Sequence, residues 1–455
     1  MGKEFLPYGD INETLDNIEK LVELTESTLN KNEGRMPTGL LMLDIILGGG
    51  ITTGWYTNFG KEQSCKTTLA VTILFSALKH NVPFKYYMDF EGSGDPSFLE
   101  NIMHRMGIPG NIKEIFGEKD NKNNWIHKPK IRYRDEAIAE KFFDFLSQLE
   151  RKLPDKRYIG DSWYYIYENT KLNKSIVGDR FDKKYLQKHG KLRVPAENGS
   201  LQAIVVLDSY PAMLPERMDV DDPSNAMAVQ ARMFSEQLKR VKGRMKGKRI
   251  AVLGVNQLRL NPGARFGNPE YEPGGEALKL FSDVRMRLAS RAISAVQGAV
   301  GKGVEKEPSV NMEGEDTYRY IHGRAIKNKL SVPDLESFFR LWITDANGEA
   351  QGFDPVFDTW NYLKATGQLI GKRSAMKIAL QNGNKSRKSL NWLEFKTLIL
   401  GDKKQMMAVF KSCKMEKPVL LRRFCEKQMA SGKGLDLYFE TKRTMPKEVK
   451  EEESE

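Results

Sequence analysis

The segment 60–68, Gly-Lys-Glu-Gln-Ser-Cys-Lys-Thr-Thr, holds residue types that bind the phosphates of a nucleotide. It lies between an expected strand over 55–59 and an expected helix over 67–80. A turn in this setting directs backbone N–H groups and the positive end of the helix dipole at one anion. Lys66 would contact the β- and γ-phosphates of ATP, and the Thr67 hydroxyl would ligate Mg²⁺. The expected nucleotide-binding residues are Gly60, Glu62, Gln63, Ser64, Cys65, Lys66, Thr67 and Thr68.

Cys65 departs from the usual pattern, G-x-x-x-x-G-K-[ST], which has a second glycine at this position. If the position requires a positive φ, cysteine carries strain that glycine would not. If it is an ordinary start of a helix, the change is harmless. A chance match in a lysine-rich chain is a further alternative when this loop is considered alone.

Two further expected strands, 84–89 and 203–208, each end in an acidic residue. The second is continuously apolar before its acid, which is typical of a strand buried on both faces of a parallel sheet. Acids at the carboxyl ends of such strands lie beside the ligand crevice. We therefore expect Asp208 to hold the Mg²⁺ shell and Glu91 to orient and deprotonate the attacking water. For either acid alone, the alternative is a helix cap or a turn.

Two long connections follow these strands. The fourth expected strand, 249–255, leads into Gln257 and then into 258–275, which is rich in Gly, Pro and Asn. The stretch 211–224 after Asp208 is similar. Loops of this length within a compact domain are usually functional or disordered. We expect both to leave the same side of the sheet.

Composition limits the classes of protein. The chain has 455 residues, enough for two or three domains, and its three cysteines, Cys65, Cys413 and Cys425, are too scattered for a disulfide framework or a zinc site. No run of eighteen apolar residues occurs and the N-terminus has no apolar signal core, so we expect a cytoplasmic protein without a membrane span. The net charge of +12 is concentrated in 121–200, with 18 Lys/Arg against 11 Asp/Glu, and in 371–455, with 20 against 11. This distribution suits the steering of a polyanion, and solvated lysine faces are the alternative.

Further motifs follow in a fixed order between residues 35 and 370, and with the phosphate loop they resemble the RecA-type bacterial and phage recombinases. The resemblance implies an α/β fold: a RecA-type phosphate-loop NTPase core with a mostly parallel twisted sheet, an N-terminal helix, an inserted subdomain and a small C-terminal α/β domain. Single motifs are weak, whereas the ordered set is specific. The motifs lie at 88–91, 95–96, 205–209, 227–233, 255–259, 266–270, 274–279 and 327–329.

The resemblance also implies roles for single residues near the nucleotide. Asp95 and Phe98 stand where the family contacts and stacks the adenine. Gln257 stands where the family senses the γ-phosphate, and an amide that bonds this group only when it is present can switch a loop between two arrangements. Lys327 and Lys329, on an expected strand over 318–329, stand where family members reach the nucleotide of the adjacent subunit; solvated strand lysines are the alternative. Lys279 and Arg285 match interface positions.

The two long connections match the family's DNA-binding loops. Arginine and lysine neutralise phosphates, glycine allows the DNA backbone to approach, and apolar residues can wedge between bases. For Met227 the alternative is the buried face of the helix that runs to Met245. The expected DNA-binding residues are Met227, Arg232 and Lys239 in or just after the first loop, and Arg259, Pro262, Gly274 and Gly275 in the second.

We expect the following division of the chain. Residues 1–34 form an amphipathic helix that either folds back on its own domain or docks on a neighbouring subunit. The ATPase core comprises 35–110 and 201–370. The insertion 111–200 is basic and rich in aromatic residues, a composition that suits single-stranded nucleic acid but suits the core of a small domain better. Residues 371–455 form a basic C-terminal domain whose short acidic tail is either an internal competitor for DNA or a solvated terminus.

Together these expectations describe an ATP-dependent recombinase. Such a protein is a DNA-dependent ATPase that forms a helical filament on single-stranded DNA, with ATP at subunit interfaces, and pairs that strand with homologous double-stranded DNA. Single-strand-binding and loader proteins are possible partners. The alternatives are a hexameric DnaB-like helicase built on the same core, and a non-hydrolysing DNA-binding paralogue that Cys65 alone would support.

Overall fold

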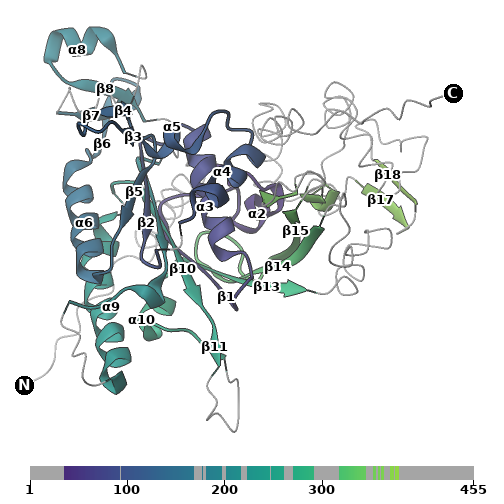
Figure 1. The fold of residues 1–455 in the computed structure, drawn as a ribbon. Helices are drawn as coiled ribbons and strands as arrows, with labels where there is room; N and C mark the ends of the chain where they lie inside the picture. Colours follow the sequence, from purple (N-terminus) through teal and green to yellow (C-terminus); the bar gives the residue numbers. More distant parts are fainter. Residues whose placement is uncertain are drawn as a thin grey trace, which may run out of the picture.

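The core of the molecule is a nine-stranded sheet with the order β16-β15-β14-β13-β1-β10-β9-β2-β5 (Figure 1). The strands from β13 to β5 are parallel, and β14, β15 and β16 continue the sheet in antiparallel fashion. The predicted strands 55–59, 84–89, 203–208, 249–255 and 318–329 all belong to this sheet. The nine strands are β16 (Gly352–Phe353), β15 (Glu336–Thr344), β14 (Thr317–Asn328), β13 (Val284–Arg291), β1 (Gly54–Gly60), β10 (Ile250–Gln257), β9 (Ala203–Asp208), β2 (Phe84–Asp89) and β5 (Arg132–Asp135).

The computed structural model describes only part of the chain. The predicted N-terminal helix, Pro262 and most of the predicted C-terminal domain lie outside the described residues, apart from β17 (Leu369–Lys372) and β18 (Ala375–Ile378). No described helix combines the length and the apolar character that crossing a membrane requires. The described residues are 35–92, 94–168, 177, 181–196, 201–216, 223–245, 247–260, 270–291, 317–344, 352–354, 357–358, 360–362, 369–372 and 375–378.

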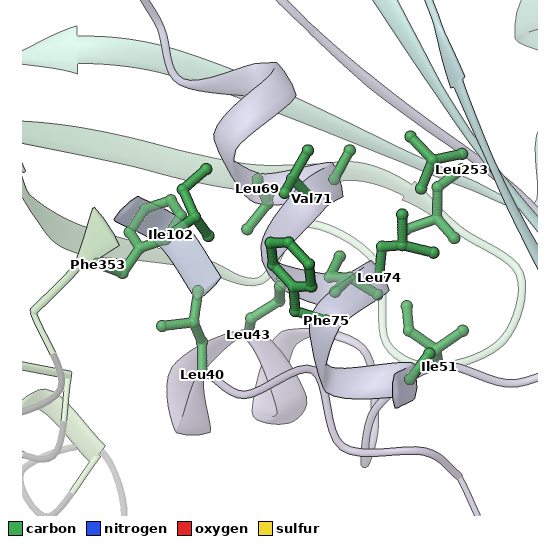
Figure 2. Close-up of a cluster of buried hydrophobic side chains, with 14 of the residues drawn as sticks. Leu40, Leu43, Ile51, Leu69, Val71, Leu74, Phe75, Ile102, Leu253 and Phe353 are labelled. Atoms are coloured by element: carbon green, nitrogen blue, oxygen red, sulfur yellow. The ribbon is translucent and has the colours of Figure 1, made fainter. Parts of the chain in front are cut away.

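Helices cover both faces of the sheet, because the central strands are apolar on both sides. Along β9, Ile204 and Val206 enter one hydrophobic cluster, whereas Val205 and Leu207 enter another. The first cluster lies under α2 (Leu41–Ile46), α3 (Lys66–Lys79), α4 (Pro96–Arg105) and α5 (Ile112–Phe116), and Figure 2 shows α3 contributing to it. The second lies under α6 (Ala139–Lys152), α9 (Pro223–Met245) and α10 (Gly275–Phe281). This three-layer arrangement confirms the predicted α/β fold class.

The segment predicted as one insertion, 111–200, divides into two parts. Its first part belongs to the core, because β5 pairs with β2 and α6 buries Phe142, Phe143 and Leu146 against the sheet. A small antiparallel hairpin of β3 (Glu118–Lys119) and β4 (Trp125–His127) precedes β5. The predicted boundary of the insertion is therefore corrected for residues 111–152. The edge strand β5 pairs with the main sheet and the apolar face of α6 packs against it, so both belong to the core.

The second part is a small module with its own apolar cluster. Its described elements include a three-stranded sheet and the helix α8, and its cluster includes Tyr165, Tyr167 and Leu192. It is attached where strands of the main sheet begin: Tyr167 donates to Gln202 just before β9, and Lys248 Nζ, just before β10, donates to Leu153 O. Its elements are β6 (Lys156–Ile159), β7 (Ser162–Tyr167), α8 (Lys183–His189) and β8 (Leu192–Pro195).

Candidate functional site

The candidate residues gather at the carboxyl edge of the sheet. In the register of the central strands, Gly60 at the end of β1 pairs with Gln257 at the end of β10. Asp89 at the end of β2 pairs with Asp208 at the end of β9. Because β1, β10, β9 and β2 are neighbours, all four ends lie along one edge of the sheet, the usual ligand position in an open parallel sheet.

The loop 60–66 closes tightly over the start of α3. A Cβ atom on Gly60 would lie 2.1 Å from Leu288 O of β13, so only glycine fits there. Within the loop, Ser64 Oγ donates to Lys61 O at 2.7 Å, and Lys66 Nζ donates to the same oxygen at 2.5 Å. Burial lowers the pKa of Lys66, while nearby acids, Asp208 first, oppose that shift. The N-terminus of α3 has neither a side-chain cap nor an acidic residue in its first turn, which leaves its N–H groups available to an anion.

Cys65 has a left-handed backbone conformation, with φ 62° and ψ 30°. The position that is usually glycine therefore does require a positive φ, and cysteine is strained there. Of the two readings of this position, the harmless one is wrong. Gln63, with φ 55°, is a second left-handed non-glycine residue in the same loop.

Asp208 and Thr67 form a pair suited to a divalent cation. Thr67 Oγ1 donates to Asp208 Oδ2 at 2.7 Å, and Tyr87 OH lies 3.3 Å from the same oxygen. The other oxygen, Oδ1, is buried without a hydrogen-bond partner among the described residues. Burial raises the pKa of Asp208 to about 6, although the Thr67 hydrogen bond opposes this shift. An unpaired hard oxygen beside a hydroxyl fits Mg²⁺.

The protein offers this cation few ligands of its own. No group of three or more His, Cys, Asp or Glu residues that could hold a metal occurs within the described part of the chain. Mg²⁺ commonly keeps several waters and takes one or two protein ligands plus substrate phosphates. The pair of Thr67 and Asp208 is compatible with that mode of binding.

Glu91 is held by hydrogen bonds at the same edge of the sheet as this pair. Its Oε1 accepts hydrogen bonds from Ser209 Oγ and from Gln257 Nε2, the latter at 3.1 Å. Ser209 follows Asp208, whereas Gln257 ends β10, so three sheet-edge segments converge on one carboxylate. The structure thus brings together Glu91 and Gln257, which are 166 residues apart in the sequence.

Asp89 is a site residue that the sequence analysis did not assign. It is fully buried, and its Oδ1 accepts from Glu91 N at 3.1 Å and Gly92 N at 2.9 Å, while its Oδ2 accepts from Gly94 N at 2.8 Å. Tyr133 of β5 also donates to Oδ2, at 2.8 Å. Asp89 therefore shapes the turn that presents Glu91. Its position at the end of β2 could have identified it from the sequence, but the catalytic role was assigned to Glu91, two residues later.

The second long connection is tied to the phosphate loop. Its two ends pair as β11 (Arg259–Leu260) and β12 (Glu270–Tyr271), so it begins as a short ribbon rather than as the wholly irregular loop predicted. Leu258 N donates to Gly60 O at 3.0 Å. Lys61 Nζ lies 3.2 Å from Glu270 Oε1 of β12. A change in the loop 60–66 therefore has direct contacts through which to reach the ribbon.

The DNA-binding candidates occupy helical and ribbon positions. Met227, Arg232 and Lys239 all lie on α9. This helix begins at Pro223, and proline is favoured at the first position of a helix. Arg232 is exposed and forms an ion pair with Glu236 at 3.0 Å. Lys239 and Arg259 are also exposed. Nothing is described for the side chain of Met227, so its two readings remain open.

Gly274 and Gly275 have a packing role that was not predicted. Both have positive φ at the start of α10. A Cβ on Gly274 would lie 2.4 Å from Leu278 Cδ1, and one on Gly275 would lie 2.8 Å from Ala231 Cβ of α9. Close contact between α9 and α10 thus explains both glycines without DNA.

Asp95 and Phe98, the adenine candidates, lie at the start of α4. Asp95 caps this helix by accepting from Ser97 N at 2.9 Å, and it is exposed. Phe98 is half-buried against the first hydrophobic cluster. The two side chains are one turn apart on one helix, but the geometry of the isolated chain gives them structural partners.

Lys327 and Lys329 lie at the far end of β14 from the phosphate loop. Lys327 Nζ donates to Lys279 O at 2.6 Å and to Leu280 O at 2.9 Å, near the C-terminus of α10. Lys329 is exposed and follows the end of β14 at Asn328, so the strand ends one residue earlier than the predicted 318–329. Arg285 is already paired with Glu272 of the same chain, and Lys279 with Glu276.

Comparisons with known proteins identify similar chains. The family model described as the RecA N-terminal domain matches residues 193–333, a span that begins after the phosphate loop. The chain is 27% identical to Protein RecA of Aquifex aeolicus (strain VF5) over 350 residues, which covers 73% of this chain and 76% of that one. It is 27% identical to Protein RecA of Aquifex pyrophilus over 348 residues, covering 72% and 75%. With Protein RecA of Thermus aquaticus it shares 25% identity over 339 residues, covering 73% and 72%.

Proposed function

We propose that this chain is a RecA-type protein: a DNA-dependent ATPase that assembles on single-stranded DNA and promotes homologous pairing and strand exchange in recombination and repair. The observation that carries this proposal is the convergence of Glu91, Gln257 and the pair Thr67–Asp208 at one edge of the sheet, beside the phosphate loop. Each of these side chains has a separate task in phosphoryl transfer to water.

The nucleotide binds at the loop 60–68, where backbone N–H groups and Lys66 face its phosphates. Lys66 then exchanges its internal bond to Lys61 O for the β- and γ-phosphates. Bound Mg²⁺ would be held by Thr67 and Asp208 and would neutralise charge that develops on the phosphates. The orphaned Oδ1 of Asp208 supports this assignment, because a buried carboxylate oxygen without a partner is costly unless a ligand completes it.

Glu91 orients the attacking water and accepts its proton. The hydrogen bonds from Ser209 and Gln257 to Oε1 fix the carboxylate and leave its other oxygen to the water. Asp89 holds the turn that carries Glu91. Gln257 can exchange Glu91 for a γ-phosphate oxygen, which makes its contacts depend on the state of the nucleotide.

The same exchange would reach the DNA. Gln257 precedes the ribbon β11–β12, and the Lys61–Glu270 and Leu258–Gly60 contacts join that ribbon to the phosphate loop. ATP binding would order the two DNA loops, and hydrolysis would relax them. Arg259, exposed on the ribbon, and Arg232 and Lys239, exposed on α9, are the described cations available to DNA phosphates.

Assembly would complete the site. Lys327 and Lys329 stand away from the phosphate loop of their own chain, in a basic group with Lys242 and Arg285 that depresses the pKa of Lys327 in addition to the effect of burial. Such a group favours an anion from outside, and the nucleotide of an adjacent subunit meets that requirement. This arrangement would couple hydrolysis to filament formation.

Two substitutions test the proposal. Lys66→Ala should abolish ATP hydrolysis, because it removes the ammonium group that would contact the β- and γ-phosphates. Glu91→Gln should retain assembly on single-stranded DNA while turnover falls by about 100-fold or more, in the range typical of general-base loss. Phosphate release with and without single-stranded DNA measures turnover, and electron micrographs of the ATP-bound protein on DNA measure assembly.

Matched controls come from exposed charges away from this edge of the sheet. Lys191→Ala, in the small module that is attached where the strands of the main sheet begin, should leave both readouts unchanged. Normal turnover in either site variant would refute the mechanism. Rings in place of filaments would favour the hexameric motor, and wild-type protein that binds DNA without consuming ATP would favour the non-hydrolysing paralogue.

A further inference from the structure

Arg319 contacts the phosphate loop from a distant part of the chain. Its guanidinium donates a hydrogen bond from Nη1 to Gln63 O at 2.9 Å, across 256 residues of sequence. The strand directions explain the contact. β13 is parallel to β1, and β14 is antiparallel to β13, so the beginning of β14 lies at the edge where β1 ends. Arg319 is the third residue of β14 and therefore reaches the loop that follows β1.

The contact is made where the loop is strained. Gln63 and Cys65, on either side of Ser64, are both left-handed without being glycine. Lys61 O is fixed from inside the loop by Ser64 Oγ and Lys66 Nζ. Gln63 O accepts a weak hydrogen bond from Cys65 Sγ at 4.0 Å inside the loop, and its charged donor, the guanidinium of Arg319, comes from outside the loop. A charged donor forms a stronger hydrogen bond than a neutral one and can hold a carbonyl orientation that the local backbone disfavours.

We propose that Arg319 is a positioning residue of the nucleotide site: by holding Gln63 O, it keeps the phosphate loop in its anion-facing shape although cysteine replaces glycine at position 65. The inference rests on the proposed function in that the anion is the triphosphate of ATP. Arg319 donates to a carbonyl oxygen of the loop, whereas phosphates would be bound by the backbone N–H groups of the loop. Its task is therefore to shape the loop rather than to stabilise the transition state.

The strain at Cys65 makes the proposal specific. Glycine adopts the left-handed conformation without steric cost, so a loop with glycine at this position needs no external brace. Removing Arg319 should therefore matter in the natural sequence and should matter much less in the Cys65→Gly background. A guanidinium that acted on the nucleotide itself would be needed equally in both backgrounds.

The first experiment measures the affinity for a fluorescent ATP analogue and the turnover at saturating ATP in full-length protein. Arg319→Ala should raise Kd about 10-fold, the loss expected for one charge-assisted hydrogen bond, while turnover at saturation changes less than about two-fold. In the Cys65→Gly background the same substitution should change Kd less than about two-fold. Arg324→Ala, on the same strand but paired with Asp334, is the matched control and should leave Kd unchanged.

The second experiment needs no nucleotide and so separates this inference from the proposed function. In a background with Cys413→Ser and Cys425→Ser, only Cys65 reacts with a maleimide. Its thiol is half-buried, so labelling of the braced loop should be slow. Arg319→Ala should speed labelling several-fold, even though the loss of a positive charge near the thiol acts in the opposite direction, whereas Arg324→Ala should not.

The outcomes are decisive. Faster labelling with protein that never binds ATP would keep the brace and remove the proposed function. Unchanged labelling in Arg319→Ala, or an equal loss of affinity in the natural and Cys65→Gly backgrounds, would overturn the assignment of Arg319.

Discussion

The central sheet differs between the edge where its parallel strands begin, the amino edge, and the edge where they end, the carboxyl edge. The difference lies in how completely the polar side chains find hydrogen-bond partners. At the amino edge, Gln202 has all its side-chain groups engaged: Nε2 donates to Pro154 O at 2.9 Å and Lys248 O at 3.0 Å, and Oε1 accepts from Tyr167 OH at 3.0 Å. At the carboxyl edge, Asp208 has an unpartnered buried oxygen, and Cys65 is left-handed. Left-handed backbone occurs at both edges, because Arg249, just before β10, has φ 52°; the unpartnered oxygen of Asp208 beside the Thr67 hydroxyl is what marks the carboxyl edge as a ligand site.

The aromatic residues of the module 156–195 show the same separation. Tyr165 and Tyr167 are buried in its cluster, as the small-domain reading predicted. Trp163 and Tyr158 remain on its surface, 39% and 58% exposed, with Lys156 Nζ 4.9 Å from the Trp163 ring. Because the module is attached at the amino edge, this surface is remote from the carboxyl edge in the same subunit. We propose that it is separate from the nucleotide and DNA-loop machinery.

The largest expected difference is between alanine substitutions at two glycines, Gly60 in the loop at the carboxyl edge and Gly160 in the module attached at the amino edge. Gly60→Ala would place Cβ 2.1 Å from a backbone oxygen, so the loop must shift, and misplacement of about 1 Å can cost about 100-fold in turnover. Gly160→Ala, in the module, meets nothing within 4 Å and carries only the cost of its positive φ, about 1 kcal/mol. Phosphate release and thermal melting of both variants measure the contrast, and equal turnover would remove it.

A smaller effect is expected at Lys327. Burial lowers the pKa of this lysine to about 8, whereas the unfolded chain keeps it near 10.4. At a pH between these two pKa values the unfolded chain binds more protons than the folded protein, so the contribution of Lys327 to folding stability rises with pH. In the folded protein, Lys327 loses its positive charge above about pH 8. Turnover in the assembled state should therefore fall several-fold above pH ~8. Lys327→Arg should remove that alkaline limb because arginine stays charged; a limb that persists would exclude Lys327 as its source.

The smallest effect is expected on the exposed face of the module. Trp163→Ala should change DNA-stimulated ATP turnover by less than about two-fold, since surface substitutions away from a site usually cost within about 0.5 kcal/mol. Leu192→Ala, in the buried cluster, should lower the melting temperature without a matching loss of turnover. A large loss of turnover with Trp163→Ala would show that the two edges are not independent.

Several parts of this protein followed from the sequence alone. A continuous apolar strand that ends in an acid predicted β9 and its place in a parallel sheet, and the residues around Lys66 predicted the strand, turn and helix found at β1 and α3. These inferences succeed because burial on both faces and the start of a helix each impose a local pattern. The pattern of 111–200 was less informative, because an edge strand with its covering helix and a separate small module both need aromatic residues.

The sequence by itself placed Lys66, Glu91 and Asp208 through their neighbours in the chain, whereas the role of Gln257 came from the family resemblance. Only the tertiary structure decided that Gln257 and Ser209 hold Glu91, that Asp89 shapes its turn, and that Arg319 reaches Gln63 O. The physical reason is strand order. Contacts between the ends of strands far apart in sequence depend on which strands are neighbours and on their directions, and local periodicity carries neither.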